Sequence, residues 1–410
     1  MTDIPVSTPA ARHFSLKPLM FESFVCSMAM MAFVALAGPI ARVLGLQPWA
    51  IGVAMTIAGV AWMVMARVWG VASDRRGRRR ILLLGLLGFA VSYLLLTVFI
   101  DLALRTAMAP LLAFAGLVIG RGIAGVFYAA VPATGMALVA DHIPAEQRTG
   151  AMAAIGASSA AGMVVGPGFA GLVGAWNLSV PLYFIAALPT IALIVLWRVL
   201  PRDQGRALAD NPQPLRLSDA RLRTPMIAAF VSMFSVASAQ VIVGFYALDR
   251  LGLDPSGAAR AAGLALAVVG VALVLAQLAL RRLGWPPIRL IAIGALVGGV
   301  GFASVALATS PIHLWLAYAT AAAGMGWLFP AVSGLASSLV GPDEQGAAAG
   351  SIAAAQGLGV VLGPLVATGV YSLDTRASYL LTGLMLVLIA LWIGRGAFSN
   401  DAPARPDAGI

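Results

Sequence analysis

Twelve long apolar runs dominate this 410-residue sequence and decide what it can fold into. A helix needs about 20 consecutive apolar residues to cross a bilayer. Strands that cross a bilayer need about 10 residues of alternating character, a pattern that these continuous runs do not have. We therefore predict an all-α polytopic membrane protein with twelve transmembrane helices, at 19–41, 50–69, 81–100, 110–139, 150–174, 178–200, 224–247, 258–280, 288–309, 312–338, 346–371 and 376–395.

The overall composition supports lipid as the solvent. Hydrophobic residues make up 60% of the chain and charged residues only 10%, whereas about 25% of a soluble domain is charged. The net charge of +10 is explained by basic loops on one side of a membrane, so we expect no nucleic-acid partner. The single cysteine, Cys26, excludes a disulfide framework, and His13, His142 and His313 are not spaced as metal ligands. No phosphate-binding loop motif occurs, so we expect neither metal nor nucleotide cofactor.

Basic residues are spread unevenly between the connections of the twelve runs. Twenty of the 26 Arg and Lys residues fall on the side that carries both termini, five fall on the other side, and Arg121 lies inside the fourth run. Arginine and lysine retained in short cytoplasmic loops set the orientation of a membrane protein. We therefore predict a multi-pass protein of the bacterial inner membrane with both termini in the cytoplasm. The densest basic cluster lies between the second and third runs: Arg75, Arg76, Arg78, Arg79 and Arg80.

The chain divides into two halves that echo each other. A glycine–proline motif occurs once in each half, 197 residues apart: Gly162, Gly166 and Pro167 in the fifth run, and Gly359, Gly363 and Pro364 in the eleventh. A parallel repeat of two six-helix bundles is typical of transporters that bind their substrate between the halves. We predict a cytoplasmic tail at 1–18, an N-terminal bundle at 19–200, a cytoplasmic central loop at 201–223, a C-terminal bundle at 224–395 and a cytoplasmic tail at 396–410.

Three motifs follow one another in the first half. They are Gly70, Asp74, Arg75, Gly77, Arg78 and Arg79 after the second run, Gly120, Arg121, Gly122 and Gly125 in the fourth, and Gly162, Gly166, Pro167, Ala170 and Gly171 in the fifth. In residue type, spacing and order they resemble the signatures of the major facilitator superfamily, and within it those of the twelve-helix drug/proton antiporters. The resemblance covers about residues 15–395. It implies two pseudo-symmetric six-helix bundles and export by antiport.

Two ionisable residues lie well inside predicted spans, where a charge is costly and usually functional. Glu22, about one turn into the first helix, is a carboxyl that can be titrated when substrate or water enters. Its alternative role is an interfacial acid beside Lys17. Arg121, about halfway along the fourth helix, must be paired or face a wet cavity, or serve as a structural arginine bonded to backbone carbonyls. We predict that both couple protons to transport, as the resemblance implies for an acid on the first helix.

The basic connection after the second run is expected to do more than orient the chain. In the family that it resembles, the acidic residue of this motif latches the two halves together on the cytoplasmic side. We therefore expect Asp74 to close against the start of the eleventh span, while Arg76, Arg79 and Arg80 mainly hold orientation. The predicted cytoplasmic gate comprises Gly70, Asp74, Arg75, Gly77, Arg78, Asp343 and Glu344.

The two glycine–proline motifs are predicted hinges of the fifth and eleventh helices. Proline removes a backbone hydrogen bond and bends a membrane helix, and glycine lets two helices approach closely. The alternative is generic packing of small residues. The predicted hinge residues are Gly162, Gly166, Pro167, Gly359, Gly363 and Pro364.

Aromatic and amide side chains on the first, fourth, seventh and tenth spans would suit a large amphiphile. The predicted cavity residues are Phe24, Phe127, Tyr128, Gln240, Phe245, Tyr246, Trp327 and Phe329, each of which could instead pack in the core or face lipid. We predict a monomeric, proton-coupled exporter of a small amphiphilic compound, embedded in the lipid bilayer and not an enzyme. The alternatives are a uniporter or symporter that imports a small polar solute, and a membrane receptor or scaffold that does not transport.

Overall fold

Every regular element in the described residues, 15–200, 219–341 and 344–399 of this computed structural model, is a helix. Twelve segments are long and apolar enough to cross a membrane, which confirms the predicted fold class. The helices are α1 (Lys17–Val43), α2 (Pro48–Arg76), α3 (Arg78–Thr106), α4 (Pro110–Tyr128), α5 (Ala130–His142), α6 (Ala145–Gly174), α7 (Val180–Val199), η1 (Ala220–Leu222), α8 (Arg223–Asp249), α9 (Pro255–Leu283), α10 (Pro287–Val305), α11 (Pro311–Ser338), α12 (Gln345–Leu373) and α13 (Ala377–Ser399).

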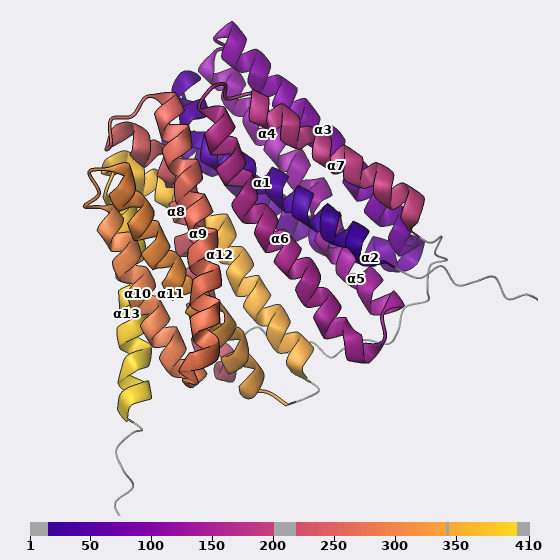
Figure 1. Ribbon diagram of the computed structural model, residues 1–410, viewed down its shortest axis with the longest axis vertical. Coiled ribbons are helices and arrows are strands. Elements are labelled where there is room, and N and C mark those ends of the chain that lie inside the picture. The colour runs from indigo at the N-terminus through magenta and orange to yellow at the C-terminus, as the bar shows by residue number, and fades with distance from the viewer. Residues whose placement is uncertain (1–14, 201–218, 342–343, 400–410) are drawn as a thin grey trace, which may run out of the picture.

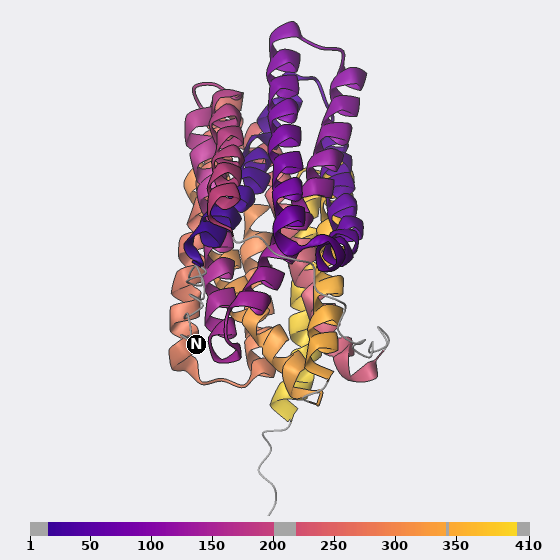
Figure 2. The same cartoon turned by 90° about the vertical axis from the view of Figure 1, so that its right-hand side faces the viewer.

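The helices form two bundles, α1–α7 and α8–α13, that lie side by side (Figure 1). Figure 2 shows the helices of both bundles running roughly along one axis, as spans of a single bilayer must. We call the side where α1 begins, at Lys17, the terminal face, and the side where it ends, at Val43, the distal face. In Figure 1 the bundles meet toward the distal face and separate toward the terminal face, where α6 and α12 begin.

The basic connection between the second and third spans is almost entirely helical. Helix α2 continues to Arg76 and α3 begins at Arg78, so only Gly77 separates them. Gly77 has a φ of 94°, a conformation that side chains with a Cβ rarely adopt. Arginine is a good helix former, so both helices extend beyond the apolar runs that mark the bilayer. The predicted loop is therefore a hinge of one residue.

The fourth predicted span consists of two helices. Helix α4 ends at Tyr128 and α5 begins at Ala130, although both lie within one membrane-length segment, Pro110–Val139. Pro132 follows closely and has no N–H to donate to the carbonyl of Tyr128, which weakens the helix at this point. The run length predicted the span correctly but did not predict this break.

The most buried spans are α1 and α8, one in each bundle. Within the most apolar window of each helix, 83% of the residues of α1 and 67% of those of α8 are buried. Helix α1 packs closely against α6, and α8 packs closely against α12. These two pairs place the glycine–proline motifs beside the central helices of their bundles.

Candidate functional site

Glycines of α6 bring its backbone into contact with α1. A Cβ added at Gly162 would collide with the carbonyl oxygen of Phe24, and one added at Gly166 would lie 2.5 Å from that of Met28. Next to these contacts, the hydroxyls of Ser27 on α1 and Ser159 on α6 are 2.6 Å apart. Glycine is therefore required at both positions for this packing distance, as in other close helix pairs in membranes.

The C-terminal bundle repeats this contact. A Cβ at Gly359 would lie 2.7 Å from the carbonyl oxygen of Phe230, and one at Gly363 would lie 2.8 Å from that of Phe234. Ser238 also donates a hydrogen bond of 3.1 Å to the carbonyl of Gly363. Both glycine–proline motifs thus pack a helix against the central helix of its bundle. Their predicted role as hinges stays a prediction, since α6 and α12 each run unbroken through their proline.

The same two helices also join the bundles near the distal face. On α6, a Cβ added at Gly171 would lie 2.6 Å from the Cα of Gly263 on α9. On α12, the carbonyl oxygen of Pro364 lies 2.8 Å from a Cβ added at Gly52 of α2. We call these two contacts the backbone joint, because main-chain atoms and glycines of one bundle touch those of the other.

An ion pair closes the distal face beside the backbone joint. Arg42 at the end of α1 pairs with Asp249 at the end of α8. Tyr371 of α12 donates a hydrogen bond of 3.0 Å to the other carboxylate oxygen of Asp249. Sequence reasoning did not single out these residues, because a charged residue at the end of a span looks like an ordinary interfacial residue.

At the terminal face the predicted gate residues contact their own bundle. Asp74 pairs with Arg78, which also donates to Asp141 at 3.1 Å and to the hydroxyl of Ser73 at 2.7 Å. Gly70 has open space around its Cβ position, and so does Gly350 on α12. Within the described residues, the ion pair of Asp74 is thus with Arg78 of its own bundle, and the gate stays a prediction.

On the other bundle, Glu344 pairs with Arg221 at 2.9 Å, and Arg221 pairs with Asp219 at 2.8 Å. The Arg221 guanidinium, through its side-chain hydrogen bonds, holds the pKa of Asp219 and the pKa of Glu344 below their usual values. Arg75 is exposed. Asp343 lies outside the described residues.

Arg79 has a structural contact that the sequence did not predict. Its Nε donates to the carbonyl of Leu200 at 3.0 Å and its Nη2 to that of Trp197 at 2.6 Å. The last carbonyls of a helix have no partner within the helix, and a cation there also complements the helix dipole. Arg79 therefore ties the start of α3 to the end of α7, in addition to the orienting role predicted for it.

Glu22 is buried in the N-terminal bundle, with 1% of its surface exposed. Its Oε1 has no hydrogen-bond partner among the described residues. Cys26, one turn along α1, and Tyr128 at the end of α4 are close enough to interact with its charge. The Tyr128 hydroxyl is also 3.5 Å from Ser27, so polar groups continue from Glu22 toward the seam between α1 and α6.

Arg121 is equally buried, at 1% exposure, and lies over the ring of Phe33 at 4.9 Å. Its Nη2 is 3.2 Å from the sulfur of Met55, while Nε and Nη1 have no partner among the described residues. Tyr93 is close enough to interact with it electrostatically. No ion pair joins Glu22 to Arg121 in the described part of the chain, so the two predicted coupling residues occupy separate environments.

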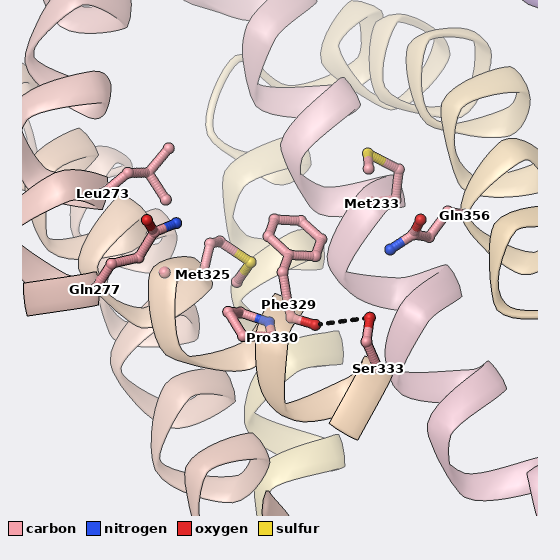
Figure 3. Close-up of a pocket in the computed structure, with 9 residues that line it drawn as sticks. Met233, Leu273, Gln277, Met325, Phe329, Pro330, Ser333 and Gln356 are labelled. Atoms are coloured by element: carbon pink, nitrogen blue, oxygen red, sulfur yellow. Dashed lines mark hydrogen bonds between the residues drawn. The ribbon is translucent and has the colours of Figure 1, made fainter. Parts of the chain in front are cut away.

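A pocket of about 350 Å³ lies in the C-terminal bundle (Figure 3). Helices α8, α9, α11 and α12 supply its lining residues, which are Met233, Leu273, Gln277, Met325, Gly326, Phe329, Pro330, Ser333 and Gln356. Figure 3 shows Gln277 and Gln356 entering from opposite sides, with the ring of Phe329 between them. Sequence reasoning missed both amides, although polar residues inside apolar runs were the available signal.

Of the eight predicted cavity residues, Phe329 lines this pocket. Trp327 donates from Nε1 to the carbonyl of Ala276 at 2.9 Å, which ties α11 to α9 beside the pocket. Phe245 and Tyr246 are buried near the distal end of α8, with 1% and 0% exposure.

The other four predicted residues lie elsewhere in the two bundles. Phe127 packs on Trp69 and borders an apolar groove between α3 and α4. Phe24 and Tyr128 pack against the core, and Gln240 is half-buried on α8.

The family is decided by a match over most of the chain. The model of the Major Facilitator Superfamily matches residues 19–364. The chain belongs to this superfamily. Major facilitator proteins are membrane transporters, so the family and the twelve candidate spans point to a multi-pass transporter rather than an enzyme.

Similar major facilitator proteins include drug-resistance proteins of bacteria. The chain is 29% identical to the class C tetracycline resistance protein of Escherichia coli over 379 residues, which cover 85% of this chain and 88% of that protein. It is 22% identical to multidrug resistance protein 2 of Bacillus subtilis (strain 168), with 94% of this chain and 96% of that protein covered.

Among solved structures, the fold is similar to that of a bacterial homologue of the human lysosomal transporter Spinster in an inward-facing and occupied conformation. The TM-score is 0.74 at 15% identity, and the match covers 97% of this chain and 100% of that one.

Proposed function

We propose that this major facilitator protein is a proton-driven exporter of small amphiphilic compounds. The observation that carries the proposal is the carboxyl of Glu22, which is buried in a membrane-spanning helix and has one oxygen without a hydrogen-bond partner among the described residues. Isolated charges are costly in such surroundings, and ionisable residues within spans usually serve transport or proton transfer. Glu22 is the proton carrier of the exporter.

The surroundings of Glu22 explain how it would exchange its proton. An ionised carboxylate would be unpaired here, so Glu22 holds a proton in this conformation. Tyr128, Ser27 and Ser159 supply hydroxyls from three helices next to it. Movement of α6 along its seam with α1 admits water to these hydroxyls and releases the proton. We propose that this movement brings Arg121, in the same bundle, closer to Glu22, so that its positive charge favours the release.

The distribution of arginine supports a cytoplasmic location for the terminal face in the bacterial inner membrane. The distal face then points away from the cytoplasm, and the structure corresponds to an inward-open state. In the outward-open state the bundles rock about their contacts, and Asp74 closes against the start of α12. The transporter works as a monomer in the lipid bilayer, without a metal or nucleotide.

The substrate class is supported by the relatives. Those at 22–29% identity bear names that specify tetracycline resistance and multidrug resistance. The pocket among α8, α9, α11 and α12 offers mixed apolar and polar contacts to such a compound. Export of an amphiphilic drug or metabolite from the cytoplasm or the inner leaflet follows from this chemistry.

Transport by purified protein in liposomes tests the proposal. With an imposed pH gradient, we expect the wild type to accumulate tetracycline against its concentration gradient, with protons moving the other way. Glu22→Gln should abolish accumulation but retain exchange of labelled for unlabelled tetracycline, because the neutral amide resembles the protonated acid. Asp101→Asn is the matched control, because Asp101 lies at the distal face and pairs with Arg105.

The same assay distinguishes the alternatives. Accumulation that ignores the pH gradient and is unchanged by Glu22→Gln would overturn the coupling assignment. Uptake of a solute with protons moving in the same direction would indicate a symporter.

A further inference from the structure

The pocket in the C-terminal bundle contains no ionisable side chain. Its nine lining residues are six apolar side chains or glycine and proline, and three neutral polar side chains. The three polar groups are the amides of Gln277 and Gln356 and the hydroxyl of Ser333. A charged ligand group placed among them would find no counter-charge in the lining. The lining residues therefore favour an uncharged ligand, or the uncharged part of a larger one.

The free hydrogen-bonding groups of the pocket are mainly acceptors. Pro330 has no N–H, so the carbonyl of Gly326, four residues earlier and also in the lining, lacks its helical partner. The hydroxyl of Ser333 donates to the carbonyl of Phe329 at 3.4 Å, which leaves the lone pairs of its oxygen available. Each glutamine adds a carbonyl oxygen as well as an NH₂ group. A ligand that donates hydrogen bonds matches this set better than one that only accepts them.

The apolar part of the lining suits a flat aromatic ring. Met233 and Met325 contribute thioethers, which are polarisable and make favourable contacts with aromatic rings. Figure 3 shows Met325 and Gln277 on one side of the Phe329 ring and Met233 and Gln356 on the other. Offset or edge-to-face contact with Phe329 would orient a planar ligand between the two amides.

We propose that this pocket binds the uncharged ring system of a hydroxylated planar aromatic compound, with Gln277 and Gln356 bonding its hydroxyl groups from opposite sides. The proposal rests on the proposed function and specifies the substrate class of that exporter. A volume of about 350 Å³ lies at the small end of ligand sites, which accommodates two or three rings. Gln277 and Gln356 are then specificity-determining residues that contact the substrate directly.

Equilibrium dialysis against protein in lipid nanodiscs tests the proposal with a matched pair of probes. 7-Hydroxyflavone carries one hydroxyl donor, and 7-methoxyflavone has the same ring system without the donor. We expect the wild type to bind the hydroxy compound about fivefold more tightly, which is within the range of one hydrogen bond. Empty nanodiscs correct for partition into lipid, and a pH of about 6 keeps the hydroxyl group neutral.

The variants Gln277→Leu and Gln356→Leu should each lower this selectivity, and the double variant should bring the ratio of the two dissociation constants close to one. The ratio is measured within one preparation, so partial unfolding of a variant cancels. Gln47→Leu, on the exposed N-cap of α2, is the matched control and should keep the wild-type ratio. Equal affinity of the wild type for both probes, or full selectivity in the double variant, would overturn the proposal.

The binding assay tests the ligand of the pocket, and the transport assay tests the proposed function, so the two proposals can be contradicted independently. Selective binding of 7-hydroxyflavone without any transport driven by a pH gradient would leave the pocket assignment intact and overturn the proposed function. Proton-driven transport of tetracycline by a protein that does not distinguish the two flavones would do the reverse. Preference for a permanently cationic probe, ethidium, over 7-hydroxyflavone would also overturn the assignment of an uncharged substrate.

Discussion

Arg42 and Asp249 form an ion pair that joins the distal ends of the two central helices, α1 and α8. The pair is partly accessible, with 51% of the Arg42 side chain and 24% of the Asp249 side chain exposed. Tyr371 of α12 holds the carboxylate from its other side. The distal closure therefore combines a charged contact with the backbone joint formed by α6 with α9 and α2 with α12.

Removal of the Arg42–Asp249 pair should favour opening of the distal face. A partly exposed pair contributes about 1 kcal/mol or less, so Asp249→Asn should shift the ratio of open to closed molecules by up to about fivefold. Spin labels at Leu111 and Leu307, exposed residues near the distal ends of the two bundles, would report the change by pulsed electron spin resonance in a Cys26→Ala background. The swapped variant, Arg42→Asp with Asp249→Arg, should restore the wild-type distances. An unchanged distribution in Asp249→Asn would show that the pair does not hold the face closed.

A methyl group at the backbone joint should have a larger effect. The Cβ of Gly263→Ala would lie 2.6 Å from the Cα of Gly171 and 2.7 Å from the carbonyl of Pro167, so α9 must move away from α6. Overpacking of this kind costs about 1–3 kcal/mol, which should appear as lower thermal stability and longer distances between the distal labels. Gly156→Ala, where the added methyl meets open space, should be neutral or slightly stabilising. Equal thermal stability and equal distal distances in Gly263→Ala and Gly156→Ala would contradict the close contact between α6 and α9.

Replacement of Arg121 by methionine should separate stability from transport. The guanidinium is buried, and its Nε and Nη1 have no hydrogen-bond partner among the described residues, so an apolar side chain at this position removes the cost of burying an uncompensated charge. We expect Arg121→Met to unfold at an equal or higher temperature than the wild type and to lose proton-driven transport. Arg105→Met, which removes an exposed pair with Asp101, serves as the control. Strong destabilisation by Arg121→Met would show that the arginine has a structural role.

The cluster of Asp219, Arg221 and Glu344 should make stability depend on pH at the acid end. Arg221 lowers the pKa values of both carboxyls in the folded protein. Their contribution to the free energy of unfolding is therefore complete above the pKa of a carboxyl in the unfolded chain, which is about 4. It is lost as the pH falls through the lower folded values. Wild type should therefore be more stable than Arg221→Gln at about pH 6, and the difference should shrink below about pH 4. Thermal unfolding between these pH values measures the difference in stability between the wild type and Arg221→Gln, and Arg282→Gln, at an exposed arginine, is the control. A difference that stays constant with pH would contradict the stabilisation of the two carboxylates by Arg221.

The twelve spans could be predicted from the sequence because bilayer thickness imposes a length that hydropathy reports directly. The ends of the helices could not. Hydropathy at Gly70–Arg80 indicates where lipid ends, while arginine continues the helix, so α2 and α3 extend to either side of Gly77. The break at Ala129 depends on one missing donor, at Pro132, within an otherwise apolar run.

The pocket among α8, α9, α11 and α12 was harder to predict than the spans. Phe329 was among the eight predicted cavity residues, but Gln277 and Gln356 were not, and Tyr246 is instead bonded to backbone carbonyls in the core. The direction in which a side chain points depends on the rotation of its helix, which packing against neighbours sets. Glu22 and Arg121 are buried inside spans, where the sequence predicted them to lie. That they occupy separate surroundings depends on the packing of the helices and could not be predicted from the sequence.

The backbone joint has an evolutionary consequence. Its contacts involve glycines, main-chain carbonyls and the side chain of Thr368, none of which lines the pocket, so its shape does not depend on which side chains line the pocket. Under the proposed function, substitutions at Met233, Gln277 or Gln356 would change what is bound while the contacts of the joint keep their fit. A chain built in this way can acquire a new substrate range by a few point mutations and inherit a working transport cycle unchanged.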